Sequence, residues 1–165
     1  MLDKLVHNNR GYLLIESIIA ITLVTIGLLG IFSLLSRSLS LNRVVSDRVK
    51  AAYLAAEGIE IVKNLMDNNL IQERPWNYEI GDGEYEVDYQ SISLSPKQAR
   101  FLNFNPVDGF YSYDNFQPTN FQRTVAINTS KDGQEIRVNS KVNWTTRGGG
   151  KFDINLEDHF FNWRQ

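Results

Sequence analysis

An uninterrupted apolar segment near the N-terminus limits what this chain can fold into. Residues 18–35 read IIAITLVTIGLLGIFSLL and contain no charged side chain. At about 1.5 Å per residue, a helix of this segment would extend roughly 27 Å, which approaches the thickness of the hydrocarbon core of a bilayer. Residues 12–17 extend the segment further, so we expect a helix that crosses a membrane once.

Two other interpretations of the apolar segment were weighed. A cleaved secretory signal would be shorter and would end in small residues at a cleavage site, whereas Arg37 is followed by a long helical pattern. A buried helix of a soluble protein would normally carry a polar face, and this segment has only scattered Ser, Thr and Gly. Lys4 and Arg10 lie on the N-terminal flank, so the positive-inside rule favours an extracytoplasmic location for the bulk of the chain.

The helical pattern continues beyond the uncharged segment. Apolar residues recur at spacings of three or four, while most charged residues lie off this stripe, and no proline occurs between residues 12 and 74. We therefore expect one helix over residues 12–67, amphipathic in its second part and ended by residues 67–69. The predicted buried stripe consists of Leu41, Val45, Val49, Ala52, Ala56, Ile59, Val62 and Met66.

After Pro75 the hydrophobic period changes from that of a helix to that of strands. Residues 84–89 alternate between acidic and apolar side chains, and turn residues 81–83 separate them from residues 76–80, which predicts a hairpin. Residues 92–120 contain three prolines and many aromatic side chains, so we expect an irregular connection with one short strand at residues 109–113.

The strand pattern then returns in three consecutive segments. Residues 124–129, 136–144 and 152–156 alternate between apolar and polar side chains and are separated by glycine-containing turns. Such alternation is typical of an antiparallel sheet with one covered face, and the stripe of the preceding helix is the obvious cover. The predicted fold class is α+β, with a long N-terminal helix packed on a C-terminal antiparallel β-sheet.

Composition excludes several classes of chemistry. The chain has no cysteine, which rules out disulfides, thiolate nucleophiles and Cys-ligated metals, and its net charge of -2 indicates no broad nucleic-acid surface. We find no phosphate-binding loop or nucleophile elbow, so no catalytic residue, cofactor or metal site is predicted and the chain is not expected to be an enzyme. His159 is expected to be a packing or surface residue. Four loop aspartates do not match a calcium-loop spacing: Asp82, Asp108, Asp114 and Asp132.

The residues just before the apolar segment carry a recognisable motif. Residues 11–16 read GYLLIE, follow a short basic leader and precede the uncharged run, and this arrangement resembles the prepilin N-terminal motif of the type IV filament family. That family includes pilins, minor pilins and secretion pseudopilins. Residues 51–65, AAYLAAEGIEIVKNL, are similar to minor pilins of the pilus-modification type. The resemblance implies a pilin-like fold for most of the chain.

The resemblance also implies roles for three residues. Gly11 would be the last residue of the leader, cut by a membrane-embedded prepilin peptidase, and Tyr12 would become the methylated N-terminus. Glu16 would match the acidic fifth residue of the mature chain, which pairs with the N-terminal amine of a neighbouring subunit. Ser33 stands where many major pilins have a helix-kinking proline, and the absence of cysteine excludes a disulfide-closed loop.

Physical chemistry independently supports a pairing role for Glu16. A carboxylate four residues after a new amine at Tyr12 lies near the positive end of the helix dipole, and in a bundle it could pair with the amine of the next subunit. The plainer alternative is that Glu16 lies at the membrane interface and reaches water without a partner. Gly27 and Gly30 could allow close helix packing, although glycine is also simply common in membrane helices.

The expected organisation has four parts: a leader (1–11), a transmembrane and assembly helix (12–36), its amphipathic continuation (37–70) and a β-rich globular domain (71–165).

The expected function is that of a structural subunit of a type IV pilus-like filament, either a minor pilin or a pseudopilin. Expected partners are other pilin subunits, the prepilin peptidase/methylase, an inner-membrane assembly platform and the lipid bilayer, with no nucleic acid. The expected location is the cytoplasmic membrane, with the C-terminal domain extracytoplasmic, and then a cell-surface or periplasmic filament. The alternative is a single-pass membrane protein whose outer β domain binds a ligand or works as an enzyme.

Overall fold

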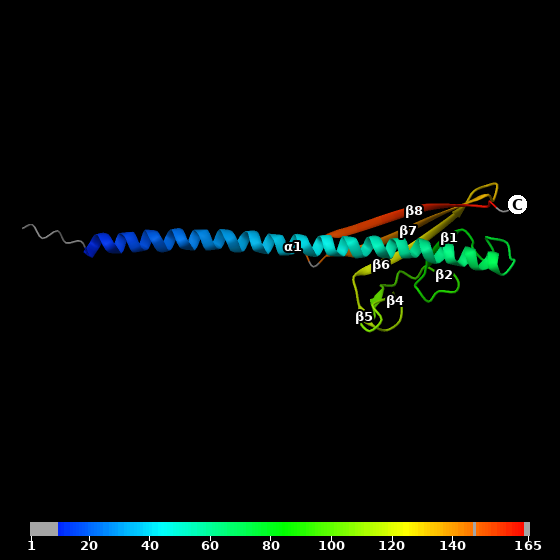
Figure 1. Ribbon diagram of the computed structural model, residues 1–165, viewed down its shortest axis with the longest axis horizontal. Coiled ribbons are helices and arrows are strands. Elements are labelled where there is room, and N and C mark those ends of the chain that lie inside the picture. The colour runs from blue at the N-terminus through cyan, green and yellow to red at the C-terminus, as the bar shows by residue number, and fades with distance from the viewer. Residues whose placement is uncertain (1–9, 147, 164–165) are drawn as a thin grey trace, which may run out of the picture. The chain divides into compact units, whose positions relative to one another are not determined.

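The computed structural model describes residues 10–146 and 148–163, with one long helix followed by eight strands (Figure 1). Residues 1–9, which form most of the expected leader and include Lys4 and His7, lie outside the described residues. The chain divides into two compact units, Met1–Val44 and Val45–Gln165. The boundaries proposed for the leader and for the membrane-spanning part remain predictions.

Helix α1 spans Arg10–Ile71, so the prediction of one helix through both segments is confirmed. The predicted C-terminal end of the helix was wrong, because residues 67–69 continue the helix instead of ending it. The side chain of Asn69 is buried and donates a hydrogen bond to the carbonyl oxygen of Tyr78 at 2.8 Å, which holds the last turn against the following loop. The helix ends where Glu73 takes a left-handed backbone conformation, with φ of 57°.

The first unit contains the N-terminal part of α1, and its described side chains do not bury one another. Every described side chain from residue 12 to residue 43 is exposed, although the segment is almost entirely apolar up to residue 35. A soluble helix would normally bury one such face. The absence of proline and the continuous backbone hydrogen bonding keep the segment helical.

The second unit is built on a five-stranded antiparallel sheet with the strand order β2-β1-β6-β7-β8. A second, three-stranded sheet has the order β4-β3-β5. The strands are β1 (Gly83–Glu86), β2 (Ser95–Pro96), β3 (Asn103–Phe104), β4 (Tyr111–Ser112), β5 (Gln117–Pro118), β6 (Phe121–Thr129), β7 (Glu135–Thr145) and β8 (Lys151–Phe161). The three consecutive antiparallel strands predicted from sequence are confirmed as β6, β7 and β8, each longer than expected. The short strand predicted at 109–113 is confirmed as β4.

The predicted hairpin before Tyr85 was wrong. Residues 76–79 form turns rather than a strand, with the amide of Tyr78 bonded to Pro75 at 2.9 Å and that of Ile80 bonded to Asn77 at 3.0 Å. Ile80 is buried in the core, and strand β1 pairs with β6 and β2 instead. Turn hydrogen bonds and the contact to Asn69 therefore decide the conformation of this segment, and these are not visible in the hydrophobic period.

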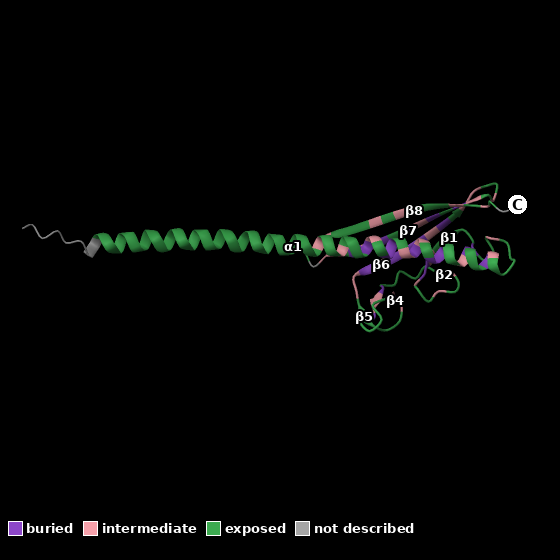
Figure 2. Ribbon diagram, viewed as in Figure 1, coloured by how far each residue is buried: buried purple, intermediate pink, exposed green. Residues whose placement is uncertain are grey.

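The second part of α1 covers one face of the large sheet, as predicted (Figure 2). Ile61, Val62 and Met66 pack with Val125 and Ile127 of β6 and with apolar residues of β7. The opposite face of the sheet is polar, as expected for an antiparallel sheet covered on one side.

The predicted buried stripe of the helix was wrong at four of its eight residues. Leu41, Val45, Val49 and Ala56 are exposed, and the first buried residue among the described side chains of α1 is Ala51. The buried row consists of Ala51, Leu54, Ala55, Gly58, Ile61, Val62 and Met66. Two rows of apolar residues run along this helix, so the 3.6-residue period predicts an amphipathic helix without deciding which row meets the sheet.

Candidate assembly site at the start of α1

The three residues of the predicted processing and assembly site lie in the first two turns of α1. The helix begins at Arg10, so Gly11 and Tyr12 lie in its first turn and Glu16 lies in its second. The ring of Tyr12 is 76% exposed and the side chain of Glu16 is exposed, whereas the surroundings of Gly11 lie outside the described side chains. Cleavage after Gly11 would make Tyr12 the positive end of the helix, with the Glu16 carboxylate four residues away.

Among the described residues, none forms a hydrogen bond or an ion pair with the carboxylate of Glu16. It is also the one charged side chain between residues 12 and 36. An ionised carboxylate in an apolar setting is costly unless it is paired, so the chain leaves a strong acceptor available to another molecule.

Three hydroxyl groups of the same segment are bonded inside the helix. Ser17 donates to the carbonyl of Leu13 at 2.8 Å, and Thr22 and Thr25 donate to carbonyls one turn earlier at 2.7 Å. These side chains therefore carry no unmet hydrogen-bonding demand into an apolar environment. Glu16 differs from them, because none of the described residues is bonded to its carboxylate.

The two glycines of the apolar segment leave open backbone surface. A Cβ atom added at Gly27 or Gly30 would meet no other atom within 4 Å. The two residues are three apart and lie on neighbouring positions of one helix face. In a membrane, where apolar helices gain little from the hydrophobic effect, such small residues allow close backbone approach.

The apolar segment is compatible with a single membrane anchor. The most apolar 18-residue window of α1 has a mean hydropathy of 2.6, and no part of that window is buried. The core helix of a soluble protein reaches similar hydropathy but is covered by its own chain. None of the described residues buries the most apolar part of this helix, which is compatible with a membrane anchor.

The structure places His159 on the protein surface, in agreement with the sequence-based expectation. Its ring is bonded to the carboxylates of Glu135 and Glu157, and these hydrogen bonds, that of Glu135 first, raise the pKa of His159. In the described part of the chain, no group of three or more His, Cys, Asp or Glu side chains is arranged to hold a metal ion.

Sequence reasoning missed a cavity near the C-terminal end of α1. It lies among residues 63–70, Trp76 and residues 159–163, which are far apart in the sequence. The aromatic residues at 160, 161 and 163 were a visible signal, but only the fold brings them to the helix and to Trp76.

Comparison with known proteins assigns no function to these sites. The chain matches no protein-family model, no curated protein and no solved structure.

Proposed function

We propose that this chain is a structural subunit of a type IV pilus-like filament, either a minor pilin or a pseudopilin. It would be held in the cytoplasmic membrane by the first part of α1, with the sheet-bearing unit outside the cytoplasm. A prepilin peptidase/methylase would remove residues 1–11 and methylate Tyr12, and an inner-membrane platform would then add the subunit to the filament. The observation that carries this proposal is that the carboxylate of Glu16 has no partner among the described residues and lies in an apolar helical segment whose described side chains are all exposed.

Leader removal would supply a partner for Glu16. Cleavage after Gly11 creates a cationic amine at Tyr12, and in a bundle of parallel helices the amine of one subunit can pair with Glu16 of the next. Removing one member of such a desolvated ion pair costs about 3–5 kcal/mol. This energy would fix the register between subunits, because only one axial offset brings the two groups together.

The remaining surface of the segment supports close packing against similar helices. The hydroxyl groups of Ser17, Thr22 and Thr25 are already bonded to helix carbonyls, and Gly27 and Gly30 leave room for a neighbouring backbone. Van der Waals contact is the main attraction between apolar helices in lipid, and it depends on such approach.

The organisation of the second unit also supports the proposal. A helix that continues from an apolar segment and covers one face of an antiparallel sheet agrees with the pilin-like fold that the N-terminal motif implies. Because the chain has no cysteine, the C-terminal region of such a subunit would be held by strand pairing rather than by a disulfide. Here β7 pairs with β8.

The proposal is tested by processing of the full chain. Co-expression with a prepilin peptidase should lower the mass by that of residues 1–11, and the new N-terminus should be methylated Tyr12. Gly11→Ala should impair the cleavage, whereas Tyr12→Phe, which keeps an aromatic ring after the cleavage point, should not. A native protein that still begins at Met1 would contradict the filament function.

A second candidate function is a membrane-anchored domain that binds a ligand outside the cytoplasm. The open cavity near Trp76 and Phe160 favours this candidate, because a purely structural subunit does not require it. The two functions differ at the N-terminus. A simple anchor predicts no leader cleavage and no effect of Glu16 on assembly.

A further inference from the structure

Strand β8 forms one edge of the large sheet. It pairs with β7 along its whole length, and no other described strand pairs with its second side (Figure 1). The strand at the opposite edge, β2, has two residues, whereas β8 has eleven. An edge strand of this length presents a row of backbone N–H and C=O groups that can pair with another chain.

The hydrogen bonds at the two ends of the ladder show which residues of β8 face its open side. Before the strand, the amide of Thr146 donates to the carbonyl of Gly150 at 2.9 Å. After the strand, the amide of Asn162 donates to the carbonyl of Gln134 at 2.9 Å. Because the backbone groups of an antiparallel strand point to its two sides at alternate residues, the even-numbered residues of β8 bond to β7. The backbone groups of the odd-numbered residues therefore point to the open side.

Three odd-numbered residues leave these backbone groups open, and we call them the β8 edge: Asp153, Asn155 and Glu157. Within the described residues, no further backbone hydrogen bond reaches them. At the next odd-numbered residue the side chain of Asp158 accepts a hydrogen bond from the amide of His159 at 2.8 Å. The chain thus occupies its own edge at His159 and leaves the preceding part of β8 unpaired.

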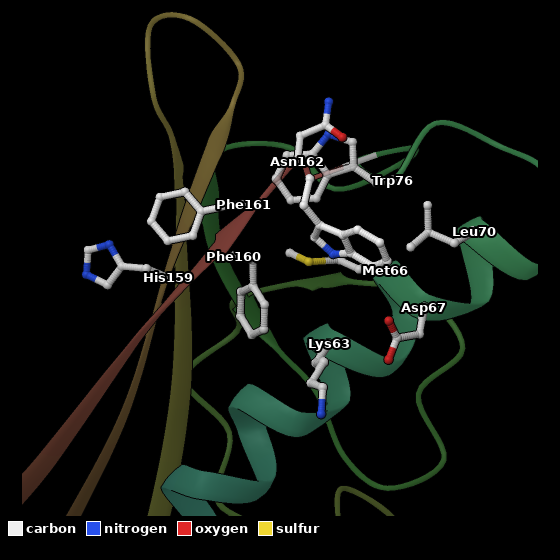
Figure 3. A pocket seen from close by; sticks show the side chains of 10 residues that line it. Lys63, Met66, Asp67, Leu70, Trp76, His159, Phe160, Phe161 and Asn162 are labelled. Atoms are coloured by element: carbon white, nitrogen blue, oxygen red, sulfur yellow. The ribbon is translucent and has the colours of Figure 1, made fainter. Parts of the chain in front are cut away.

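The side chains of β8 add an apolar row on the side of the sheet that α1 covers. Ile154 and Leu156 are half-buried against the core cluster that includes Leu54 of α1, and Phe152 is 42% exposed (Figure 2). Figure 3 shows the same alternation at the end of the strand, where Phe160 is directed toward α1 and His159 lies on the other side of β8. Alternate apolar side chains of an incoming strand would complete the cover of this row.

Charge favours a cationic group at one position of the incoming strand. The other two carboxylates of β8 have partners, since Asp153 lies 3.5 Å from Lys141 and Glu157 accepts a hydrogen bond from Asn139 at 2.7 Å. Asp158 is exposed on the side of the apolar row and forms no ion pair with any described residue. Opposite charges in cross-strand positions attract and like charges repel, so a cation is favoured opposite Asp158.

We propose that the β8 edge binds an extended segment of another protein as an additional antiparallel strand. The backbone of that segment bonds to the open groups of β8, its alternate side chains are apolar, and a Lys or Arg lies opposite Asp158. The apolar side chains meet Ile154 and Leu156 at positions without cross-strand hydrogen bonds, where side chains of paired strands are closest. This inference depends only on the second unit and stands whether or not the chain is a filament subunit.

The test uses the full chain in micelles of an uncharged detergent and an acetylated peptide amide with the sequence KTVTVTV. In the proposed register its lysine lies opposite Asp158. Its three valines lie opposite Leu156, Ile154 and Phe152, and its threonines lie opposite the β8 edge. The backbone N–H groups of the threonines therefore face β8, and those of the valines face away from it.

The readout is hydrogen exchange of the backbone amides of β8, followed in ¹H–¹⁵N spectra. In the free protein the amides of the β8 edge should exchange quickly, whereas those of Ile154 and Leu156, which are bonded to β7, should exchange slowly. The peptide should slow exchange of the β8 edge by at least about tenfold, because its amides become hydrogen-bonded.

Two N-methylated peptides form a matched pair of ligand controls. N-methylation of the middle threonine removes a donor that faces β8 and should weaken binding by about tenfold. N-methylation of the valine that follows it alters an amide that faces away and should leave binding unchanged. Replacing the lysine by norleucine, which keeps the length and removes the charge, should weaken binding by about threefold, and Asp158→Asn should abolish this difference.

Asn155→Pro tests the edge on the side of the protein. It removes an open N–H group without removing a bond to β7, so binding should be lost while the indole signal of the buried Trp144 stays in place. Asn155→Ala keeps the N–H group and should bind as the unmodified chain does.

Unchanged exchange at the β8 edge, equal affinity of the two N-methylated peptides, or binding retained in a folded Asn155→Pro variant would each overturn the proposal. The comparison of the two peptides uses the unmodified chain and decides the matter even if the proline variant fails to fold. Exchange that slows without peptide as the protein concentration rises would show that β8 pairs with a second copy of this chain, and it would also overturn the proposal.

Discussion

The guanidinium of Arg123 is bonded to the carboxylate of Glu57 at 2.7 Å and joins α1 to the centre of the sheet. Arg123 is fully buried on β6. It also donates to the carbonyl of Leu54 at 2.9 Å and to the carbonyl of Val87 just after β1. One side chain therefore ties a helix, a central strand and the end of β1 together, and its charge is balanced by a residue of α1.

Loss of Glu57 should destabilise the second unit, because it leaves a buried cation without its counter-ion. Breaking a buried ion pair costs about 3–5 kcal/mol, and we expect about 2 kcal/mol for Glu57→Ala because the Glu57 side chain is 29% exposed and water can partly replace it. The measurement is the free energy of unfolding in urea. Glu60→Ala is the matched control, since Glu60 forms an exposed pair with Lys63 and should cost less than about 0.5 kcal/mol. Equal effects of the two variants would exclude the proposed role of Arg123.

Gly58 fits closely against the sheet, so replacing it by alanine should destabilise the protein although alanine is the better helix former. An added Cβ atom would collide with Ser140 Oγ and would lie 3.1 Å from Arg123 Cδ and 3.2 Å from Val125 Cγ2. Alanine gains about 1 kcal/mol in helix propensity, and overpacking costs about 1–3 kcal/mol. We expect a net loss of about 1 kcal/mol in the free energy of unfolding. Adding Ser140→Ala should recover part of it, and a more stable Gly58→Ala variant would show that the contact relaxes freely.

Much of the fold follows from the sequence because its signals are local. The uncharged run predicts the first part of α1, and clear alternation predicts β6, β7 and β8. The row of apolar residues on α1 that meets the sheet could not be predicted. It depends on a close contact between Gly58 and Ser140, which are 82 residues apart in the sequence. The conformation of residues 76–80 likewise depends on Asn69 and on turn hydrogen bonds.

The two candidate sites also differ in how much of each site the sequence predicts. The proposed assembly site is a continuous motif, so its candidate residues Gly11, Tyr12 and Glu16 are visible in the sequence alone. The cavity near Trp76 joins the last turns of α1 to the end of β8, and no local sequence pattern reveals that these segments meet. Arg123 is a further example, since alternation places it on the covered face of β6 but does not reveal Glu57 as its partner.

His159 should make stability depend on pH in a defined direction. Its hydrogen bonds to Glu135 and Glu157 raise its pKa in the folded protein, so they favour the protonated ring. The stabilisation is therefore fully present below the unfolded pKa of about 6.5 and is lost as the pH rises through the higher folded pKa. NMR titration of the ring should give a pKa above 6.5, and Glu135→Gln should lower it. His159→Gln identifies the signal, because the sequence contains a second histidine, His7. A pKa unchanged by Glu135→Gln would contradict this pairing.

Replacing Glu16 should separate membrane insertion from filament assembly. Glu16→Val removes the single charge between residues 12 and 36, so insertion into the membrane should be unchanged or improved. Incorporation into filaments should fall sharply, because an unpaired amine in the helix bundle costs about 3–5 kcal/mol, which corresponds to a factor on the order of a hundred or more in association. Immunoblots of membrane and sheared-filament fractions measure both steps. Ser17→Ala is the neighbouring control, since that hydroxyl is already bonded to Leu13 and its loss should leave assembly unchanged. If Glu16→Val enters filaments as well as the unmodified chain does, Glu16 is an interfacial residue of the anchor and has no role in subunit pairing.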